Sequence, residues 1–164
     1  MNRQIVDKVV KDKLLCEFYS IQDDGSFDVG CVIRMYENDM LISRITKDGE
    51  ENGFQAIRYN DILFITIKSR YLGKMEKLAN NDITSRNTIP EMVNSAIDAV
   101  LWYAYKEGSN IEVAFDQPFD NLVYGKCMYV DDRMVVVKEL NSKGEADGET
   151  FFEISSIRTC CCEV

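Results

Sequence analysis

The chain has 164 residues, of which 46% are hydrophobic and 29% are charged, and its formal net charge at pH 7 is −9. This composition is typical of a globular protein, and the acidic balance excludes the indiscriminate nucleic-acid binding that a basic surface gives, so we expect no DNA partner. No apolar run has the roughly 20 residues of a membrane-spanning helix, and the N-terminus has no signal-peptide core, which predicts a cytoplasmic protein without membrane contact.

Residues 1–69 are predicted to form a short helix and five strands. Four apolar residues repeat at the spacing of one helical face: Ile5, Val6, Val9 and Val10. Runs rich in Val, Ile, Phe and Tyr, separated by turn residues and free of proline, predict the strands. They cover residues 15–21, 27–36, 40–46, 54–59 and 62–67.

Residues 70–90 join this half to the second and include a helix-like stretch at 71–79. The second half, residues 91–164, also opens with a helix. Thr88, Pro90 and Glu91 are typical of its start, and Gly108 of its end. Its apolar stripe consists of Met92, Val93, Ala96, Ile97, Val100, Leu101 and Ala104. Five further strands are predicted at 111–115, 122–130, 134–140, 150–154 and 157–162.

The two halves align with each other without a gap at a shift of 95 residues. Glycines coincide at three places: Gly30 with Gly125, Gly49 with Gly144, and Gly53 with Gly148. The charged loop 47–53 also coincides with the loop 142–148. Glycines mark turns and bends, so the matches fall where the backbone geometry is most demanding. The sequence therefore predicts a mainly β protein of two small, strongly bent, five-stranded antiparallel barrels, each preceded by an α-helix.

Two short segments of the second copy carry a family resemblance. In segment 125–134, GKCMYVDDRM, Gly125 is followed by Asp131 and Met134, and segment 157–159 reads IRT. They resemble the two sequence motifs of Sm-like domains, which have an SH3-like barrel. The resemblance implies an RNA site formed by Asp131, Met134 and Arg158, with base stacking on Tyr129. It also implies association through the edge strands of the barrels.

The same motifs depart from the family pattern at the RNA site. Val135 stands where Sm-like RNA binders have the asparagine that contacts the base, and Thr159 stands where they have a glycine. In the first copy, Tyr36 and Leu63 replace the aspartate and the arginine. The barrel tolerates these changes, whereas RNA binding depends on the residues that are replaced.

The residues of the familiar catalytic and metal sites are absent or wrongly spaced, although catalysis by Asp and Lys without a motif stays open. The chain has no histidine, no CxxC pair, and no nucleophile-elbow, phosphate-loop or dinucleotide motif. On a strand, Cys160 and Cys162 would face one side and Cys161 the other, so we expect buried free thiols and no metal site. The acidic pairs, such as Glu50-Glu51, fall in predicted turns. We therefore expect no cofactor and no enzymatic activity.

Aromatic and basic side chains are the remaining candidates for a binding surface. The aromatic set is Tyr59, Tyr71, Trp102, Tyr103, Tyr105, Tyr124 and Tyr129, and the basic set is Arg34, Arg44, Arg58, Arg70 and Arg86. They could stack bases or form a local positive patch. The plainer interpretation is that the aromatic residues cover the barrels and that the arginines are neighbours of acids.

Two functional hypotheses follow from these observations. The first is a non-catalytic binding or assembly module, whose partner is another protein or a further copy of itself. The alternative is an RNA-binding Sm-like protein that uses the local site in the second barrel.

Overall fold

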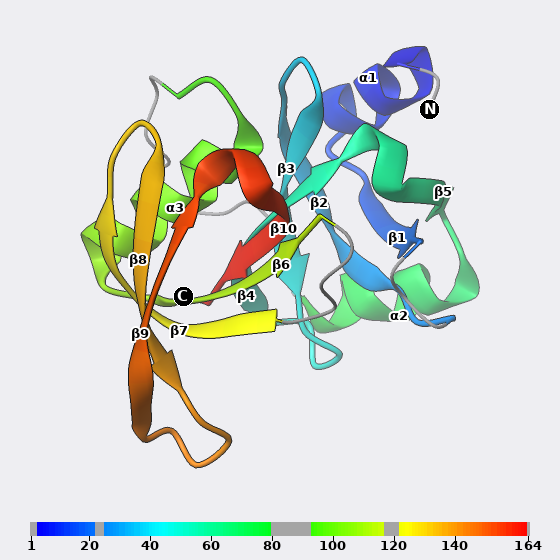
Figure 1. Cartoon of the computed structure of the whole chain (residues 1–164). Coiled ribbons are helices and arrows are strands. Elements are labelled where there is room, and N and C mark those ends of the chain that lie inside the picture. The colour runs from blue at the N-terminus through cyan, green and yellow to red at the C-terminus, as the bar shows by residue number, and fades with distance from the viewer. Residues whose placement is uncertain (1–2, 22–24, 80–92, 117–121, 164) are drawn as a thin grey trace.

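Figure 1 shows the computed structural model of the chain, which describes residues 3–21, 25–79, 93–116 and 122–163. The helix α1 (Arg3–Lys11) buries Val6 and Val9, as its helical spacing predicts, while the side chain of Ile5 is outside the described part. The strands of this half are β1 (Leu15–Ser20), β2 (Asp28–Met35), β3 (Asp39–Ile45), β4 (Glu51–Arg58) and β5 (Ile62–Ile67). The helix α2 (Arg70–Leu78) confirms the predicted helical stretch.

The second half contains the helix α3 (Ala96–Glu107) and a matching set of strands. These are β6 (Asn110–Phe115), β7 (Leu122–Val130), β8 (Met134–Leu140), β9 (Ala146–Glu153) and β10 (Ile157–Cys162). The bounds of β5, β7, β8 and β10 equal those predicted. β4 and β9 begin several residues earlier than predicted, because backbone pairing continues through their charged first residues down to the hairpin turn.

The start of α3 corrects the prediction. The predicted start at 88–91 and Met92 lie outside the described residues, but Val93 is described and is not helical. The helix begins at Ala96, where Ser95 Oγ accepts a hydrogen bond from the backbone N–H of Asp98 at 3.0 Å. Serine is a strong N-cap residue, and Ser95 lies directly before the buried Ala96 and Ile97, within the stripe that was predicted to begin at Met92. Gly108 ends the helix in the left-handed conformation, as predicted.

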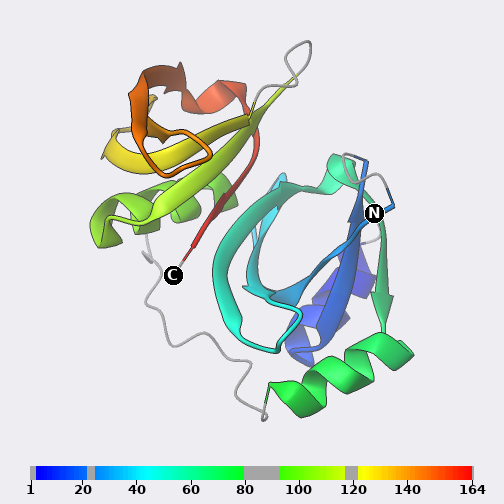
Figure 2. The same ribbon diagram turned by 90° about the horizontal axis from the view of Figure 1, so that it is seen from below.

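Within the described residues, all ten strands form one antiparallel sheet that is not closed. Their order across the sheet is β5-β1-β2-β3-β4-β10-β6-β7-β8-β9. The strands of each half therefore stay together, and each half of the sheet bends strongly (Figure 2). The prediction of a mainly β protein is confirmed.

The elements of the two halves coincide at the shift that the sequence alignment gives. Adding 95 to the bounds of β1, β3, β4 and β5 gives those of β6, β8, β9 and β10, and β2 matches β7 to within one residue. The irregular positions coincide as well. β2 and β3 lose register between Val32 and Arg34, and β7 and β8 between Cys127 and Tyr129. Since 127 and 129 are 32 and 34 plus 95, both halves bend at the same place.

The match of Gly30 with Gly125 at the shift of 95 residues has a steric cause. A Cβ on Gly30 would lie 2.2 Å from the carbonyl oxygen of Ser43, and one on Gly125 would lie 2.1 Å from that of Lys138. Lys138 is the residue that corresponds to Ser43 at the shift of 95. In both halves the neighbouring strand approaches too closely for any side chain, as expected at a sharp bend of a small sheet.

Three buried apolar clusters hold the helices to the sheet. Val6 and Val9 of α1 pack with Phe18 and Met40 on one face of the first half. In the second cluster, Leu72 and Met75 of α2 pack against residues of β1, β2 and β3. The largest cluster lies beneath α3 and combines residues of both halves. A fully buried side chain of this size contributes roughly 1.5–3 kcal/mol, so these clusters supply most of the packing free energy.

Candidate functional site

The two halves meet by pairing one strand edge with another. β10 lies between β4 of the first half and β6 of the second (Figure 1). In the β4–β10 register, Ile57 faces Thr159, Ala56 faces Cys160, Gln55 faces Cys161 and Phe54 faces Cys162. Thr159 Oγ1 also donates to the carbonyl oxygen of Ala56 at 2.7 Å. We call this pairing the internal junction.

Two arginine–carboxylate pairs cross the internal junction in opposite directions. Arg158 of β10 donates through Nε and Nη2 to the two carboxylate oxygens of Asp61, at 3.2 and 2.9 Å, and both side chains are nearly buried. Arg58 of β4 donates through Nη1 to both carboxylate oxygens of Asp116, at 3.0 and 2.9 Å, and through Nη2 to the carbonyl of Ile157. The hydrogen bonds to Asp61 raise the pKa of Arg158. Because each arginine forms two hydrogen bonds with its carboxylate, these pairs fix the relative orientation of the two side chains as well as stabilising the contact.

The helix α3 covers the internal junction from one face. It contacts β3 and β4 of the first half as well as β6, β7 and β10 of its own half. Leu41, Phe54 and Ala56 of the first half are buried in its cluster, and the rings of Phe54 and Tyr103 meet edge to face at 4.8 Å. The first half therefore completes the core of the second.

A buried carboxylate of the first half anchors the start of α3. Asp39 is 4% exposed, and its Oδ1 accepts a hydrogen bond from the backbone N–H of Ala96 at 3.0 Å. Burial raises the pKa of Asp39, and hydrogen bonds from the backbone of Ala96 and Ile97 oppose that shift. The positive end of the helix thus meets a carboxylate that belongs to the other half.

Among the described strands, β5 and β9 are the outer strands of the sheet. At the shift of 95 residues, they correspond to the two strands that pair at the internal junction. β9 corresponds to β4 and β5 corresponds to β10. On β9, Phe151 is 62% exposed, whereas its counterpart Ala56 is fully buried. On β5, Phe64 is 54% exposed, and Ile67 is 37% exposed where its counterpart Cys162 is buried. Exposed apolar edge strands are reactive surfaces.

The glycines of β4 and β9 show the same difference. A Cβ on Gly53 would lie 1.9 Å from the carbonyl oxygen of Cys162, because β10 passes directly beside it. Around Gly148, the counterpart on β9, nothing lies within 4 Å of that position. Gly148 leaves room for a strand in the position that β10 takes beside Gly53.

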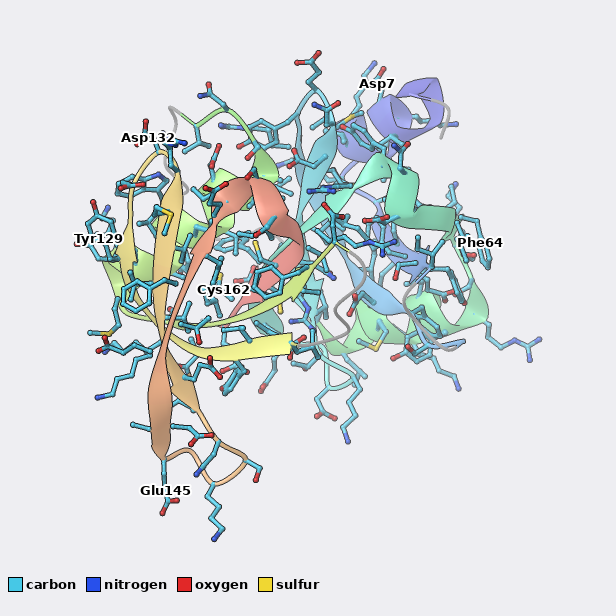
Figure 3. All side chains as sticks on the ribbon, viewed as in Figure 1. Asp7, Phe64, Tyr129, Asp132, Glu145 and Cys162 are labelled. Carbon is cyan, nitrogen blue, oxygen red and sulfur yellow. The ribbon has the colours of Figure 1, made fainter. Side chains whose placement is uncertain are left out.

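Three of the four residues predicted to bind RNA lie together at the turn between β7 and β8. Asp131 Oδ1 accepts hydrogen bonds from the backbone N–H groups of Arg133 and Met134, at 2.8 and 2.7 Å, and these bonds lower the pKa of Asp131. The exposed Tyr129 donates its hydroxyl to Asp131 Oδ2 at 3.1 Å. Figure 3 shows Tyr129 and Asp132 at one end of the molecule and Phe64 at the other.

The fourth residue, Arg158, makes its polar contacts elsewhere. Its guanidinium is engaged by Asp61, a residue of the first half, rather than by the β7–β8 turn. Met134 is half-buried as the first residue of β8. The structure thus brings Asp131, Tyr129 and Met134 together and gives Arg158 a contact at the internal junction.

The aromatic candidates divide between packing and exposure. Tyr103 is buried, and the hydroxyls of Tyr59 and Tyr124 form hydrogen bonds with Tyr36 and Asn110. The exposed rings of this set are Tyr71, Trp102, Tyr105 and Tyr129.

The arginine candidates also divide. Arg44 pairs with Asp28 at 3.6 Å, and Arg58 pairs with Asp116, which confirms for these two the interpretation as neighbours of acids. Arg34 and Arg70 are exposed, and Arg86 lies outside the described residues.

The cysteines behave as apolar side chains. Cys160 and Cys162 are buried and Cys161 is half-buried, and all of them are free thiols. Burial raises the pKa of Cys16 and of Cys162 to about 12, so both thiols are protonated at neutral pH. In the part of the chain that the structure describes, no group of three or more His, Cys, Asp or Glu side chains could hold a metal ion. No helix found there has the length and apolar character needed to cross a bilayer.

Sequence reasoning missed the acidic residues that hold the internal junction together, Asp39, Asp61 and Asp116. Asp39 begins β3, Asp61 directly precedes β5 and Asp116 directly follows β6, and each resembles an ordinary turn residue. One signal was available in the aligned halves. Arg158 corresponds to Leu63, and Arg58 corresponds to Glu153, so both arginines occur in one copy alone. Both arginines form their ion pairs at the internal junction, a contact in which Leu63 and Glu153 take no part within the chain.

Comparison with known proteins does not assign this chain to a family. No protein-family model, no curated protein and no solved structure matches this chain.

Proposed function

We propose that this protein is a non-catalytic assembly module, made of two small, strongly bent Sm-like barrels in tandem, whose outer strands β5 and β9 add strands of a partner protein. One observation carries the proposal. The chain already joins its own halves by pairing β4 with β10, and the counterparts of those two strands are the outer strands of the sheet.

The chemistry of the outer strands supports this role. Adding a strand to a sheet edge gives affinity through backbone hydrogen bonds and specificity through alternate side chains. Phe151 on β9 and Phe64 on β5 offer apolar contacts at these edges. Proteins commonly protect an outer strand with charges, proline or a covering element. The sequence of β5, ILFITI, contains no charged residue and no proline.

The test is the size of the protein in extracts of its native cells. We expect it to migrate well above the 18.8 kDa of a single chain, and the double variant Phe64→Asp, Phe151→Asp to migrate as a single chain. Leu122→Asp is the matched control, because Leu122 is 60% exposed but lies on β7, which is paired on both sides. A double variant that kept the size of the native complex would refute the proposal.

RNA binding is the second candidate, favoured by the grouping of Asp131, Met134 and the exposed Tyr129 at one turn. Fluorescence anisotropy with short U-rich and A-rich RNAs tests it. If the turn binds RNA, affinity falls with added salt, and Tyr129→Ala reduces it by about five- to hundredfold, the usual contribution of one stacked base. Tyr71→Ala, at an exposed ring on α2 of the first half, is the control. Absence of salt-sensitive binding at micromolar protein would end this candidate.

A further inference from the structure

We infer that the partner strand on β9 is β5 of a second copy of this chain, placed in the register of the internal junction, so that chains join head to tail. The inference rests on the proposed assembly role and names its partner. It follows from applying the shift of 95 residues to the junction that the chain already contains.

The shift gives a specific register between two chains. Within one chain, Ile57, Ala56, Gln55 and Phe54 face Thr159, Cys160, Cys161 and Cys162. Adding 95 to the first set and subtracting 95 from the second set pairs β9 of one chain with β5 of the next. The resulting pairs are Phe152 with Phe64, Phe151 with Ile65, Thr150 with Thr66, and Glu149 with Ile67.

The side chains fit this register. Phe152 with Phe64 and Phe151 with Ile65 place apolar residues opposite each other, and Thr150 with Thr66 is a favourable cross-strand pair. A glycine at 148 also agrees with this register. The carbonyl oxygen of Ile67 of the second copy would lie beside Gly148, in the position that the carbonyl oxygen of Cys162 takes beside Gly53. A glycine at 148 therefore admits the incoming backbone.

The helix that covers the internal junction has a counterpart as well. α3 corresponds to α1, so α1 of the second copy would cover β8 and β9 of the first. Phe54 meets Tyr103 at the internal junction, and their counterparts are Glu149 and Lys8. Both are exposed in the single chain, and their charges are opposite. An aromatic contact within the chain is thus replaced by an ion pair between chains.

The contact between chains lacks the two arginine pairs of the internal junction. The counterparts of Asp61 and Arg158 are Ser156 and Leu63, and those of Arg58 and Asp116 are Glu153 and Ile21. The contact between chains therefore relies on apolar residues and on Lys8 with Glu149. We expect it to be reversible, with a mass that increases with protein concentration.

Purified protein alone tests the inference through two single variants. Phe151→Asp blocks β9 and leaves β5 intact, and Phe64→Asp does the reverse. Light scattering is expected to give 18.8 kDa for each variant alone and twice that mass for their mixture. If like edges paired instead, one of the variants would dimerise by itself and the mixture would gain nothing, which would overturn the head-to-tail arrangement. Circular dichroism of each variant confirms that it is folded.

A charge exchange tests the register. In the mixture, Glu149→Lys on the Phe64→Asp chain weakens association by roughly three- to tenfold, and Lys8→Glu on the Phe151→Asp chain restores it. Failure of the second change to restore association would reject this register. If wild-type protein alone stayed at 18.8 kDa while the native complex still required both edges, this inference would fall and the proposed function would stand. If the native complex ignored both edges, both would fall.

Discussion

At the scale of single residues, Asp39 is a buried carboxylate of the first half whose Oδ1 accepts a hydrogen bond from the backbone N–H of Ala96. Because burial raises its pKa, the folded protein binds a proton at Asp39 more tightly than the unfolded chain does. The stability that this proton gives is complete below the unfolded pKa, and it is lost as the pH rises through the folded pKa. We expect Asp39→Asn, which keeps the oxygen that accepts from Ala96, to be at least as stable as the native protein at pH 7 and to lose that advantage in acid.

Urea unfolding at a series of pH values measures this effect. Asp39→Ala is the control, because loss of the acceptor destabilises at every pH, by about 0.5–2 kcal/mol for a helix cap. Asp131 gives the opposite sign: its pKa is lowered, so its contribution is present at neutral pH and is lost as the pH falls. A stability of Asp39→Asn well below that of the native protein at pH 7 would show that the ionised form is required.

At the scale of elements, sequence patterns predicted most of the fold because helices and strands of this protein follow local rules. Apolar periodicity located α1 and the body of α3, and turn residues separated the ten strands, several of them to the residue. The start of α3 was wrong because a tertiary contact helps to define it: Asp39 of the other half meets the backbone of Ala96. Less of the candidate site could be predicted from the sequence. Arg158 was identified from a motif, but its partner Asp61 is 97 residues away and leaves no local pattern.

At the scale of the whole molecule, the shared core predicts that the two halves unfold together. Phe54 belongs to the first half but packs on Tyr103 of the second, so Phe54→Ala removes core from both and is expected to cost about 3–5 kcal/mol. Phe18→Ala is the matched control, because Phe18 is equally buried and packs within the first half. Calorimetry is expected to show one transition for each variant, at a lower Tm. Two separate transitions would mean that the halves unfold independently.

The elements, the repeat at a shift of 95 residues and the burial of most of the thiols could be predicted from the amino-acid sequence. These features depend on side-chain pattern, turn chemistry and the steric demands of glycine, all of which act within short stretches of chain. The tertiary structure alone decided that β4 pairs with β10, that Asp61 and Asp116 hold the junction, and that β5 and β9 are the outer strands. Strands join through backbone hydrogen bonds, for which every residue carries an acceptor and every residue except proline carries a donor, so the sequence does not specify which edges meet.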